Sequence, residues 1–468
     1  MIVVFVHGWS VTNTNTYGGL PEALAQQAAA HGLELEIAHV WLGRYISFHD
    51  EVKLADLVVA FQRALADALA PGGGAVPAFA CVTHSTGGPV VREWLEHFHG
   101  AARLGEAPLR HLVMLAPANH GSPLAVLGKE RVGRMKAWFN GIEPGVGILR
   151  WLSLGSADQW RLNEAWLDYD GPAAGFYPFV LTGQGIDGKL YDFLNSYLVE
   201  VGSDGVVRAA GANVNCSVLT LTETDAVVRN GSFTPREARV LSPDGGPRRP
   251  RRPVGFGVLP RTSHSGKAMG IMGSVTAATA AQKPVVAEIL RCLAVHSAAA
   301  YDQRCRELED LTAATQADDA HSRNHRYVNL VFAIVDDQGV AVNDFDLYLM
   351  AGNRFDPAGL PKGFFIDRQR NPDTPNCLIY YLDYDVLKTA PQERLGIRVA
   401  GRPAQGFAGY RPVEFRTDGE TLLSTLQPNQ TCYIRVVLRR HVDVNAFRLG
   451  PATESSRDFK GTRPAELT

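Results

Sequence analysis

The chain alternates between short apolar runs and longer segments in which apolar residues recur every three or four positions. The short runs predict buried strands at residues 2–6, 78–83, 111–116 and 177–182, with 217–222 as a further candidate. Leu33, Leu35 and Ile37 alternate with glutamates, which predicts a half-exposed strand at a sheet edge. The longer segments predict amphipathic helices at 54–69, 89–98 and 283–295. Strands and helices in this order predict an α/β architecture, with a mostly parallel sheet covered on both faces.

The pattern changes after residue 297. Residues 298–325 are rich in Ala, Asp, Glu, Arg and Gln, which predicts an exposed helix or a linker. Beyond them, apolar runs separated by turns predict strands at 327–335, 345–350, 378–382, 395–399 and 431–438. A chain of 468 residues exceeds the length of about 250–300 residues that one hydrophobic core usually serves. We therefore predict a first domain at 1–297, a linker at 298–325 and an accessory antiparallel β-sandwich domain at 326–468.

Composition and charge narrow the class of protein. Hydrophobic residues make up 46% of the chain and charged residues 20%, which is typical of a globular protein and excludes a fibrous or wholly disordered one. The formal net charge of -2 provides no basic field for nucleic acid. The basic run at 248–252 is interrupted by Pro250 and flanked by two further prolines, which indicates a solvated loop. We expect no nucleic-acid partner.

No segment approaches the roughly 20 apolar residues that a membrane-spanning helix needs. Met1 leads directly into a strand pattern instead of a charged segment followed by an apolar one, so we expect no conventional secretory signal. The expected location is the cytoplasm, or outside the cell by a signal-independent secretion system. The six cysteines are dispersed without metal-ligand spacing, which favours structural thiols and predicts no metal site.

Candidate chemistry is concentrated around Ser85. The segment 79–91 reads FACVTHSTGGPVV, in which a strand runs through a sharp turn into a helix with a serine at the apex. This arrangement exposes a serine hydroxyl above the sheet, at the amino end of a helix. Thr83 stands where the motif has its first glycine, and Gly87 and Gly88 follow the serine. We predict that Ser85 is a nucleophile.

Backbone amides that stabilise an oxyanion are expected at two places. His7-Gly8-Trp9 ends the first strand, where the chain turns so that an N–H faces the reacting carbonyl. The residue after the nucleophile supplies the second N–H. We assign these donors to Trp9 and Thr86, and we expect His7 to shape the loop.

The acid and the base should follow the serine in the order acid, then histidine. Ser203-Asp204-Gly205 is a turn that leads into an apolar pair, and it makes Asp204 the first candidate for the acid. Asp187 is the alternative, because it closely follows the strand predicted at 177–182. His264 lies in a small polar turn before the last predicted helix, and we predict that it is the base.

With these residues in place, the chain resembles bacterial α/β-hydrolase lipases and the lipase-like branch related to lecithin:cholesterol acyltransferases. The resemblance covers about residues 1–295 and rests on His7-Gly8-Trp9, THSTGG at 83–88, APANHGSP at 116–123, SDGVV at 203–207 and Ser263-His264. It implies an α/β-hydrolase fold in which the triad cleaves carboxylic esters of acyl lipids through an acyl-enzyme, without metal or cofactor. A lipase or phospholipase activity follows, with a lipid ester as substrate.

A looser resemblance is to the lipase-type effectors of bacterial type VI secretion, which lack a signal peptide and often carry an extra domain. It implies a protein partner in the secretion machinery. Two other functions stay open at this point. An acyltransferase or thioesterase would use the same triad, and a non-catalytic binding module would use the scaffold alone.

Residues 124–175 are too long for a simple connection between strands, and they predict a helical lid. Large apolar side chains cluster there, among them Trp138, Phe139, Leu149 and Trp151. We predict that part of this surface lines an acyl-chain pocket and that part faces a membrane or another lipid interface. The alternative is a satellite helical core packed on the sheet.

Overall fold

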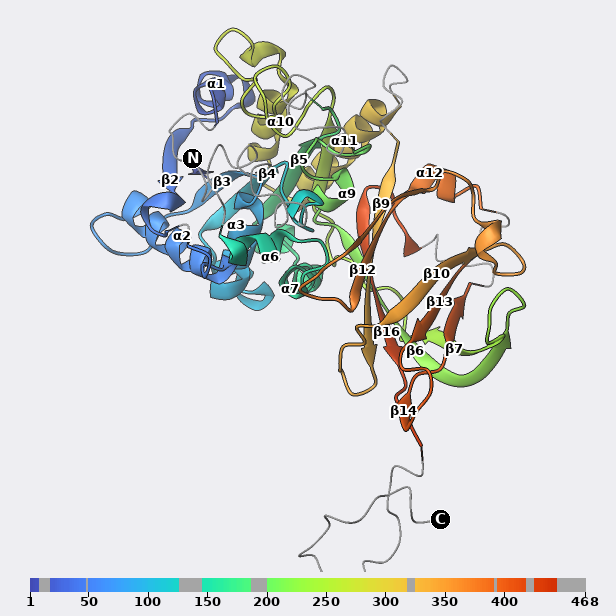
Figure 1. Cartoon of the computed structure of the whole chain (residues 1–468). Coiled ribbons are helices and arrows are strands. Elements are labelled where there is room, and N and C mark those ends of the chain that lie inside the picture. Colours follow the sequence, from blue (N-terminus) through green and yellow to red (C-terminus); the bar gives the residue numbers. More distant parts are fainter. Residues whose placement is uncertain are drawn as a thin grey trace, which may run out of the picture.

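The computed structural model places the chain around two β-sheets that lie side by side (Figure 1). It describes residues 1–7, 17–47, 49–125, 145–186, 200–317, 325–390, 394–417 and 425–443. The first sheet and its helices are formed by residues up to 316, and the second sheet combines strands from the middle and the end of the chain.

The first sheet has six strands, all paired in parallel. In spatial order they are β2 (Glu36–Trp41), β1 (Ile2–His7), β3 (Phe79–His84), β4 (Leu109–Leu115), β5 (Tyr177–Gly183) and β8 (Gly255–Leu259). This confirms the α/β-hydrolase sheet expected from the sequence. The edge position of β2 is also as expected, although the strand begins at Glu36 and extends beyond the predicted alternation.

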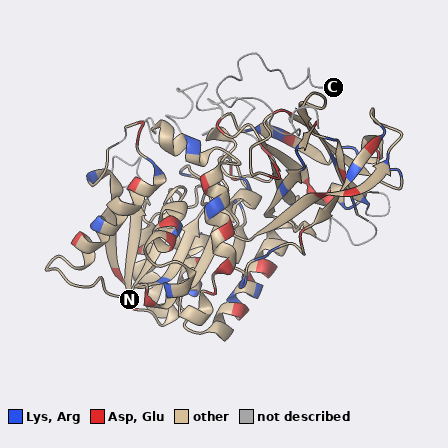
Figure 2. Cartoon of the chain, turned by 90° about the horizontal axis from the view of Figure 1, so that it is seen from below, with Lys and Arg blue, Asp and Glu red and all other residues tan. Residues whose placement is uncertain are grey.

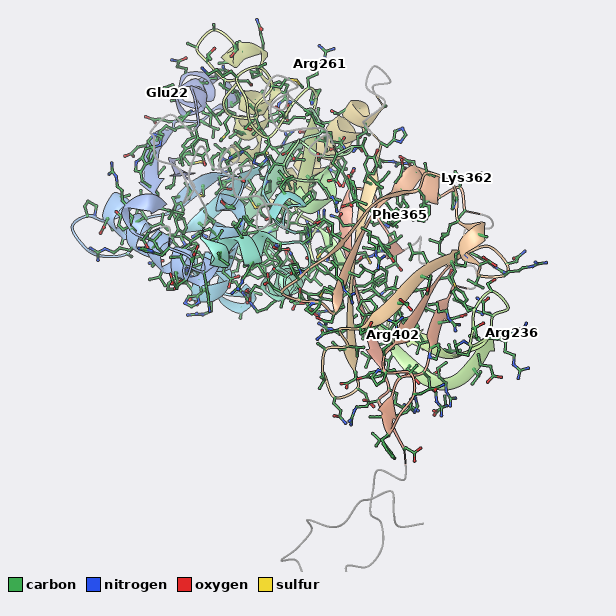
Figure 3. The ribbon with its side chains drawn as sticks, in the orientation of Figure 1. Glu22, Arg236, Arg261, Lys362, Phe365 and Arg402 are labelled. Atoms are coloured by element: carbon green, nitrogen blue, oxygen red, sulfur yellow. The ribbon has the colours of Figure 1, made fainter. Side chains whose placement is uncertain are left out.

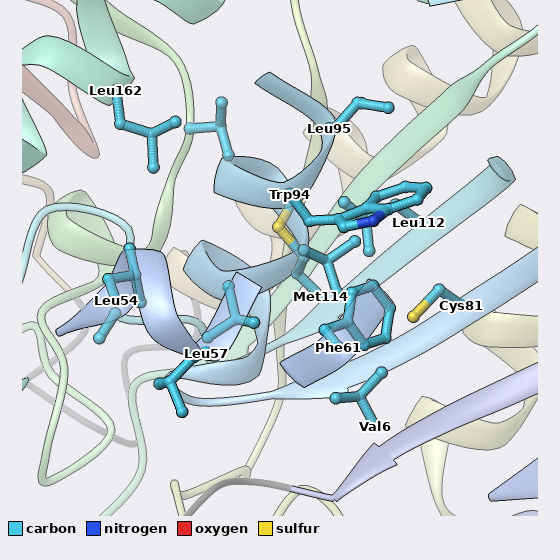
Figure 4. Close-up of a cluster of buried hydrophobic side chains, with 14 of the residues drawn as sticks. Val6, Leu54, Leu57, Phe61, Cys81, Trp94, Leu95, Leu112, Met114 and Leu162 are labelled. Atoms are coloured by element: carbon cyan, nitrogen blue, oxygen red, sulfur yellow. The ribbon is translucent and has the colours of Figure 1, made fainter. Parts of the chain in front are cut away.

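Alternating side chains of this sheet bury two hydrophobic cores, as the strand period of two requires. Val4 and Val6 face α2 (Leu54–Leu69) and α3 (Gly87–Phe98), where Phe61 and Trp94 pack edge to face (Figure 4). Val3 and Phe5 belong to the other core, which is covered by α1 (Leu20–Gln27), α10 (Pro284–Leu293) and α11 (Ala298–Gln316). Three shorter helices lie between the strands of the first half of the chain: α6 (Val146–Leu152), α7 (Ala157–Ala165) and α9 (Ala209–Ala212).

The predicted linker needs correction. Most of 298–325 is the helix α11, whose Tyr301 and Leu308 are buried in the core of the first sheet. The Tyr301 hydroxyl donates to the carbonyl of Pro178 on β5 at 3.0 Å. This helix therefore belongs to the hydrolase layer, which is the first sheet with the helices that cover it. It does not separate two domains.

The second sheet has nine strands. Their spatial order is β10 (Phe345–Ala351), β13 (Leu395–Gly401), β15 (Val413–Arg416), β7 (Glu237–Pro243), β6 (Cys216–Arg229), β16 (Gln430–Leu438), β9 (Tyr327–Asp336), β12 (Cys377–Asp383) and β11 (Phe365–Arg370). A separate small sheet joins β14 (Ala408–Gly409) to β17 (His441–Val442), and α12 (Tyr384–Leu387) follows β12.

The expected antiparallel sandwich beginning at residue 326 also needs correction. The sheet is mixed, because β16 pairs in parallel with both β6 and β9, and β15 pairs in parallel with β7. Its centre contains β6 and β7, which the sequence placed in the first domain or left unassigned. The hydrolase segment of the chain thus contributes two strands to the second sheet.

The second sheet curls so that one face encloses a core of its own. Tyr380 on β12 donates to the carbonyl of Leu347 on β10 at 3.0 Å, although these strands stand near opposite ends of the sheet order. On the outer face, Tyr433 and Ile379 pack against Trp160 of α7. The outer face of the second sheet is therefore buried against the hydrolase layer.

No helix in the described ranges is long and apolar enough to cross a membrane. Acidic and basic residues are interspersed along the described ribbon (Figure 2). This distribution fits the near-neutral net charge of -2.

Candidate active site

Ser85 lies at the turn between β3 and α3, above the carboxyl edge of the first sheet. Its φ of 53° is in the left-handed region, which costs a non-glycine residue energy and is typical of strained functional turns. The turn is held because the Ser85 amide donates to the carbonyl of Leu115 at 3.0 Å. The side chain is 9% exposed, so little solvent reaches it.

The departure from the motif at Thr83 has a steric explanation. A Cβ at Gly87 would lie 3.3 Å from the Thr83 Cβ, and a Cβ at Gly88 would lie 2.8 Å from the Pro117 Cβ. Gly87 therefore leaves the space that the threonine occupies, and Gly88 lets α3 approach Pro117 beyond the end of β4. A small β-branched residue fits before the serine for this reason.

His264 joins Ser85 to Asp204. Its Nε2 lies 3.2 Å from the Ser85 Oγ, and its Nδ1 lies 2.9 Å from the Asp204 Oδ2. Because Nδ1 must donate to the carboxylate, Nε2 is free to accept a proton from the serine hydroxyl. His264 is 1% exposed and Asp204 is fully buried, so both interactions are shielded from water.

The buried carboxylate of Asp204 has a complete set of donors. Its Oδ1 accepts from the amides of Val206 at 3.0 Å and Val207 at 2.8 Å, while Oδ2 takes the His264 proton. The backbone is joined as well, since the His264 amide donates to the Asp204 carbonyl at 2.9 Å. A buried charge is tolerated when it is hydrogen-bonded in this way. The tight turn at Asp204-Gly205-Val206-Val207 therefore orients the Asp204 carboxylate toward His264.

His84 fixes the histidine loop from the other side. Its Nε2 donates to the His264 carbonyl at 3.2 Å, and the two rings lie 4.6 Å apart. Burial lowers the pKa of His84 well below its ordinary value, so the ring is neutral. His84 therefore orients the His264 backbone and adds no charge beside it.

The segment Asn119-His120 lies beside the nucleophile helix within a buried polar network. The Nε2 of His120 donates to the carbonyl of Asn213 at 2.8 Å, and its Nδ1 accepts from the hydroxyl of Tyr433 at 2.8 Å. Burial lowers the pKa of His120 to about 3, so it stays neutral as these partners require. Arg92 on α3 donates to the side chain of Asn119 at 3.1 Å. Sequence reasoning missed Arg92 and Tyr433, since neither lies in a local motif.

Thr86 is the N-cap residue immediately before α3, and no acceptor for its amide occurs among the described residues. It is thus available to an oxyanion at the positive end of the helix. The other expected donor, Trp9, lies outside the described residues, as do Asp187, Trp138 and Phe139.

The two described lid residues have buried side chains. Trp151 is 4% exposed and Leu149 is 7% exposed, and both belong to the core that α2 shares with the first sheet. For these two residues, the burial favours the alternative of a satellite helical core packed on the sheet. Lining of an acyl pocket by them stays a prediction.

Replacing Trp151 by aspartate should therefore destabilise the whole protein. The change removes a large buried side chain and adds a charge without a partner, which we expect to cost at least about 3 kcal/mol. Thermal unfolding should shift to lower temperature, and turnover of butyrate and palmitate esters should fall by similar factors. A loss confined to the long-chain ester would instead place Trp151 in an acyl pocket.

Within the described ranges, no group of three or more His, Cys, Asp or Glu side chains is arranged to hold a metal ion. The residues brought together by the fold are a strained serine, a histidine that can act as the base and a buried, hydrogen-bonded aspartate. The fold is that of an α/β-hydrolase, and Ser85, His264 and Asp204 have the arrangement of a Ser–His–Asp triad.

Neither a family model nor a curated protein sequence matches the chain. Two solved structures of phospholipase PlaB from Legionella pneumophila are similar over nearly the full length. The structure of PlaB in complex with thio-NAD is 42% identical, covers 98% of this chain and 97% of that chain, and has a TM-score of 0.85. A second PlaB structure is 43% identical over the same shares, with a TM-score of 0.84. The chain belongs to the family of this phospholipase, and it is a lipid ester hydrolase.

Proposed function

We propose that the protein is a phospholipase that hydrolyses carboxylic ester bonds of phospholipids through an acyl-enzyme on Ser85. The observation that carries this proposal is the hydrogen-bonded chain from Ser85 Oγ through His264 to Asp204. The similarity to PlaB over 98% of the chain supports a phospholipid as the substrate class.

Acylation begins when His264 Nε2 takes the proton of the Ser85 hydroxyl while Oγ attacks the ester carbonyl carbon. The Thr86 amide, and in our assignment the Trp9 amide, donate to the oxyanion of the tetrahedral intermediate. His264 then gives the proton to the departing alcohol oxygen, and the C–O bond breaks. Asp204 keeps the neutral imidazole in the required tautomer and stabilises the imidazolium that forms after the proton transfer.

Deacylation repeats these steps with water. His264 takes a proton from a water molecule, whose oxygen attacks the acyl carbonyl, and the proton returns to Ser85 Oγ as the fatty acid leaves. The reaction transfers no hydride, so this mechanism assigns no step to the thio-NAD that PlaB binds. An alcohol in place of water would make the same site an acyltransferase.

Turnover on a lipid panel tests the substrate class. We expect release of fatty acid from phosphatidylcholine or phosphatidylglycerol vesicles. With a short-chain phosphatidylcholine, we expect faster release above the concentration at which it forms micelles. Mass spectrometry of the products gives the position of cleavage and detects transfer to an added alcohol. Hydrolysis of p-nitrophenyl esters without any action on phospholipids would contradict the proposal.

Approach to a membrane, export without an amino-terminal signal and a secretion partner stay predictions. Our proposal includes the first of these, because a two-chain phospholipid is supplied as a bilayer and not as a dissolved monomer. Co-sedimentation of the Ser85→Ala variant with vesicles measures this approach separately from hydrolysis.

A further inference from the structure

The loop at 200–208 presents Asp204 to His264, and it is closed on itself. Ser203 and Arg208 form an antiparallel bridge, and the Asp204 amide donates to the Val207 carbonyl at 3.1 Å. The Val206 and Val207 amides also hold the Asp204 carboxylate. Because the loop is this tight, a displacement at Arg208 moves the carboxylate as well.

Arg208 fixes the end of this loop to the second sheet. Its guanidinium is 1% exposed and donates to both carboxylate oxygens of Glu200, at 2.6 and 2.9 Å. It also donates to Asp367 on β11 at 2.6 Å and to Asn329 on β9 at 3.3 Å. The guanidinium carbon lies 4.1 Å from the centre of the Tyr381 ring on β12. Three strands of the second sheet therefore contact one side chain of the acid loop.

The first half of the loop fits the same surface. The Tyr381 hydroxyl donates to the Val201 carbonyl at 2.9 Å. Gly202 has a φ of 72°, and a Cβ there would lie 2.2 Å from the ring of Tyr327 on β9. The tyrosine rings thus form a wall against which the loop backbone packs directly.

Electrostatics keeps this contact in place. Burial opposes the charged form of Arg208, but Glu200 and Asp367 outweigh burial and raise the pKa of the guanidinium above its ordinary value. The side chain is charged at every working pH. Removal of one carboxylate leaves a buried charge with fewer partners, which weakens the contact between loop and sheet.

We propose that Arg208 and Asp367 are positioning residues, through which the second sheet holds the triad acid against His264. This inference rests on the proposed function only in assigning Asp204 to the triad. In this proposal the second sheet supports the active site, because its strands hold the loop that carries Asp204.

The test compares Asp367→Ala with Asp367→Asn. Alanine removes one of the acceptors that hold Arg208, and we expect the rate of Ser85 labelling by a fluorophosphonate and the kcat for ester hydrolysis to fall together, by about tenfold to a hundredfold, with KM little changed. Asparagine keeps an oxygen that accepts from Arg208, so it should restore most of both rates. Arg208→Lys, which cannot reach all of these partners at once, should behave like alanine.

A matched control comes from the same sheet. Asp346 on β10 forms an ion pair with Arg402, and their side chains are 43% and 46% exposed. Figure 3 labels Arg402, and it also labels Phe365 at the start of β11. Exposed pairs of this kind contribute about 0–1 kcal/mol. Asp346→Ala should leave the labelling rate unchanged.

The decisive measurement is a double-mutant cycle with Asp204→Asn. If Asp367 acts through Asp204, then Asp367→Ala costs less than about twofold in labelling rate once Asp204 is already asparagine. Equal losses in both backgrounds, or wild-type labelling by Asp367→Ala alone, would overturn the proposal. Labelling by the fluorophosphonate needs no lipid substrate. The cycle therefore tests the role of Asp367 even if the protein fails to hydrolyse phospholipids. That failure would contradict the proposed function but not this inference.

Discussion

Ser85→Ala is expected to lower ester hydrolysis by a factor on the order of 10⁴ or more while the protein stays folded. The serine supplies the oxygen that forms the acyl-enzyme, and alanine has no substitute for it. The side chain contributes little to packing, so the thermal unfolding transition should stay within a few degrees of wild type. Labelling of the intact protein by a fluorophosphonate, followed by mass spectrometry, checks the site directly.

His264→Ala should be nearly as damaging, and Asp204→Asn should lower turnover by up to about 10⁴ because the imidazole loses the partner that fixes its tautomer. Asp187→Asn should retain activity, since His264 already has its carboxylate partner in Asp204. Ser297→Ala is the control for loss of a serine: it removes the cap of α11, where the hydroxyl accepts from the Ala300 amide at 3.2 Å, and should leave labelling unchanged. A stronger loss in Asp187→Asn than in Asp204→Asn would show that the acid is misassigned.

Hydrophobic periodicity predicted the elements whose partners are close in the chain. The helix at 54–69 was predicted with the observed bounds. Its apolar stripe packs against the first sheet, and the nearest elements in the sequence, β2 and β3, are strands of that sheet. Strand β3, helix α3 and strand β5 were also predicted to within two residues at each end. In these cases the local pattern and the tertiary environment agree.

Strand β6 shows where this reasoning stops. Its apolar residues at 217–222 predicted a buried strand of the first sheet, yet the strand pairs with β16, which lies more than 200 residues later (Thr431 pairs with Cys216). An apolar run indicates that a strand is buried, but it does not indicate which sheet the strand joins. The choice depends on long-range pairing that one sequence does not display.

The missed strand β8 and the misread helix α11 have a common physical cause. A Cβ at Gly257 of β8 would lie 2.7 Å from the Leu308 side chain, and one at Gly255 would lie 3.3 Å from the Cys305 sulfur. The glycines let α11 pack very closely on the strand, so the helix needs few large apolar residues. The same glycines weaken the strand signal in the sequence.

The arrangement of Ser85, His264 and Asp204 could be predicted because turn chemistry and chain order restrict it locally. Serine at a strand-to-helix turn, Asp-Gly in a tight turn and histidine in a polar loop are each visible in a short segment. The residues that support the site were not predictable in this way. Arg208 is buried by contacts with Asn329, Asp367 and Tyr381, which are 121 or more positions away in the chain.

A chain that ends near residue 320 should fail to reach the native fold, even though every triad residue precedes that point. The division predicted from the sequence, with a first domain at 1–297 and an accessory domain at 326–468, would favour a hydrolase that folds on its own. The structure reverses this expectation because truncation removes β16 and β15, the partners of β6 and β7. Strand β6 would then expose a row of unpaired backbone groups, which is a site for aggregation.

Truncation would also expose the surface where α7 packs on the second sheet, including Trp160, and it would remove Tyr433 from the network around His120. Asp204 would lose the wall of tyrosine rings and the Asp367 contact that hold its loop. We therefore expect the shortened chain to lack a cooperative unfolding transition and to label with a fluorophosphonate at least about a hundredfold more slowly than the full chain. Co-expression with a separate chain covering 326–468 should restore labelling, since the missing strands return. Wild-type labelling by the shortened chain alone would show that the hydrolase layer folds without the second sheet.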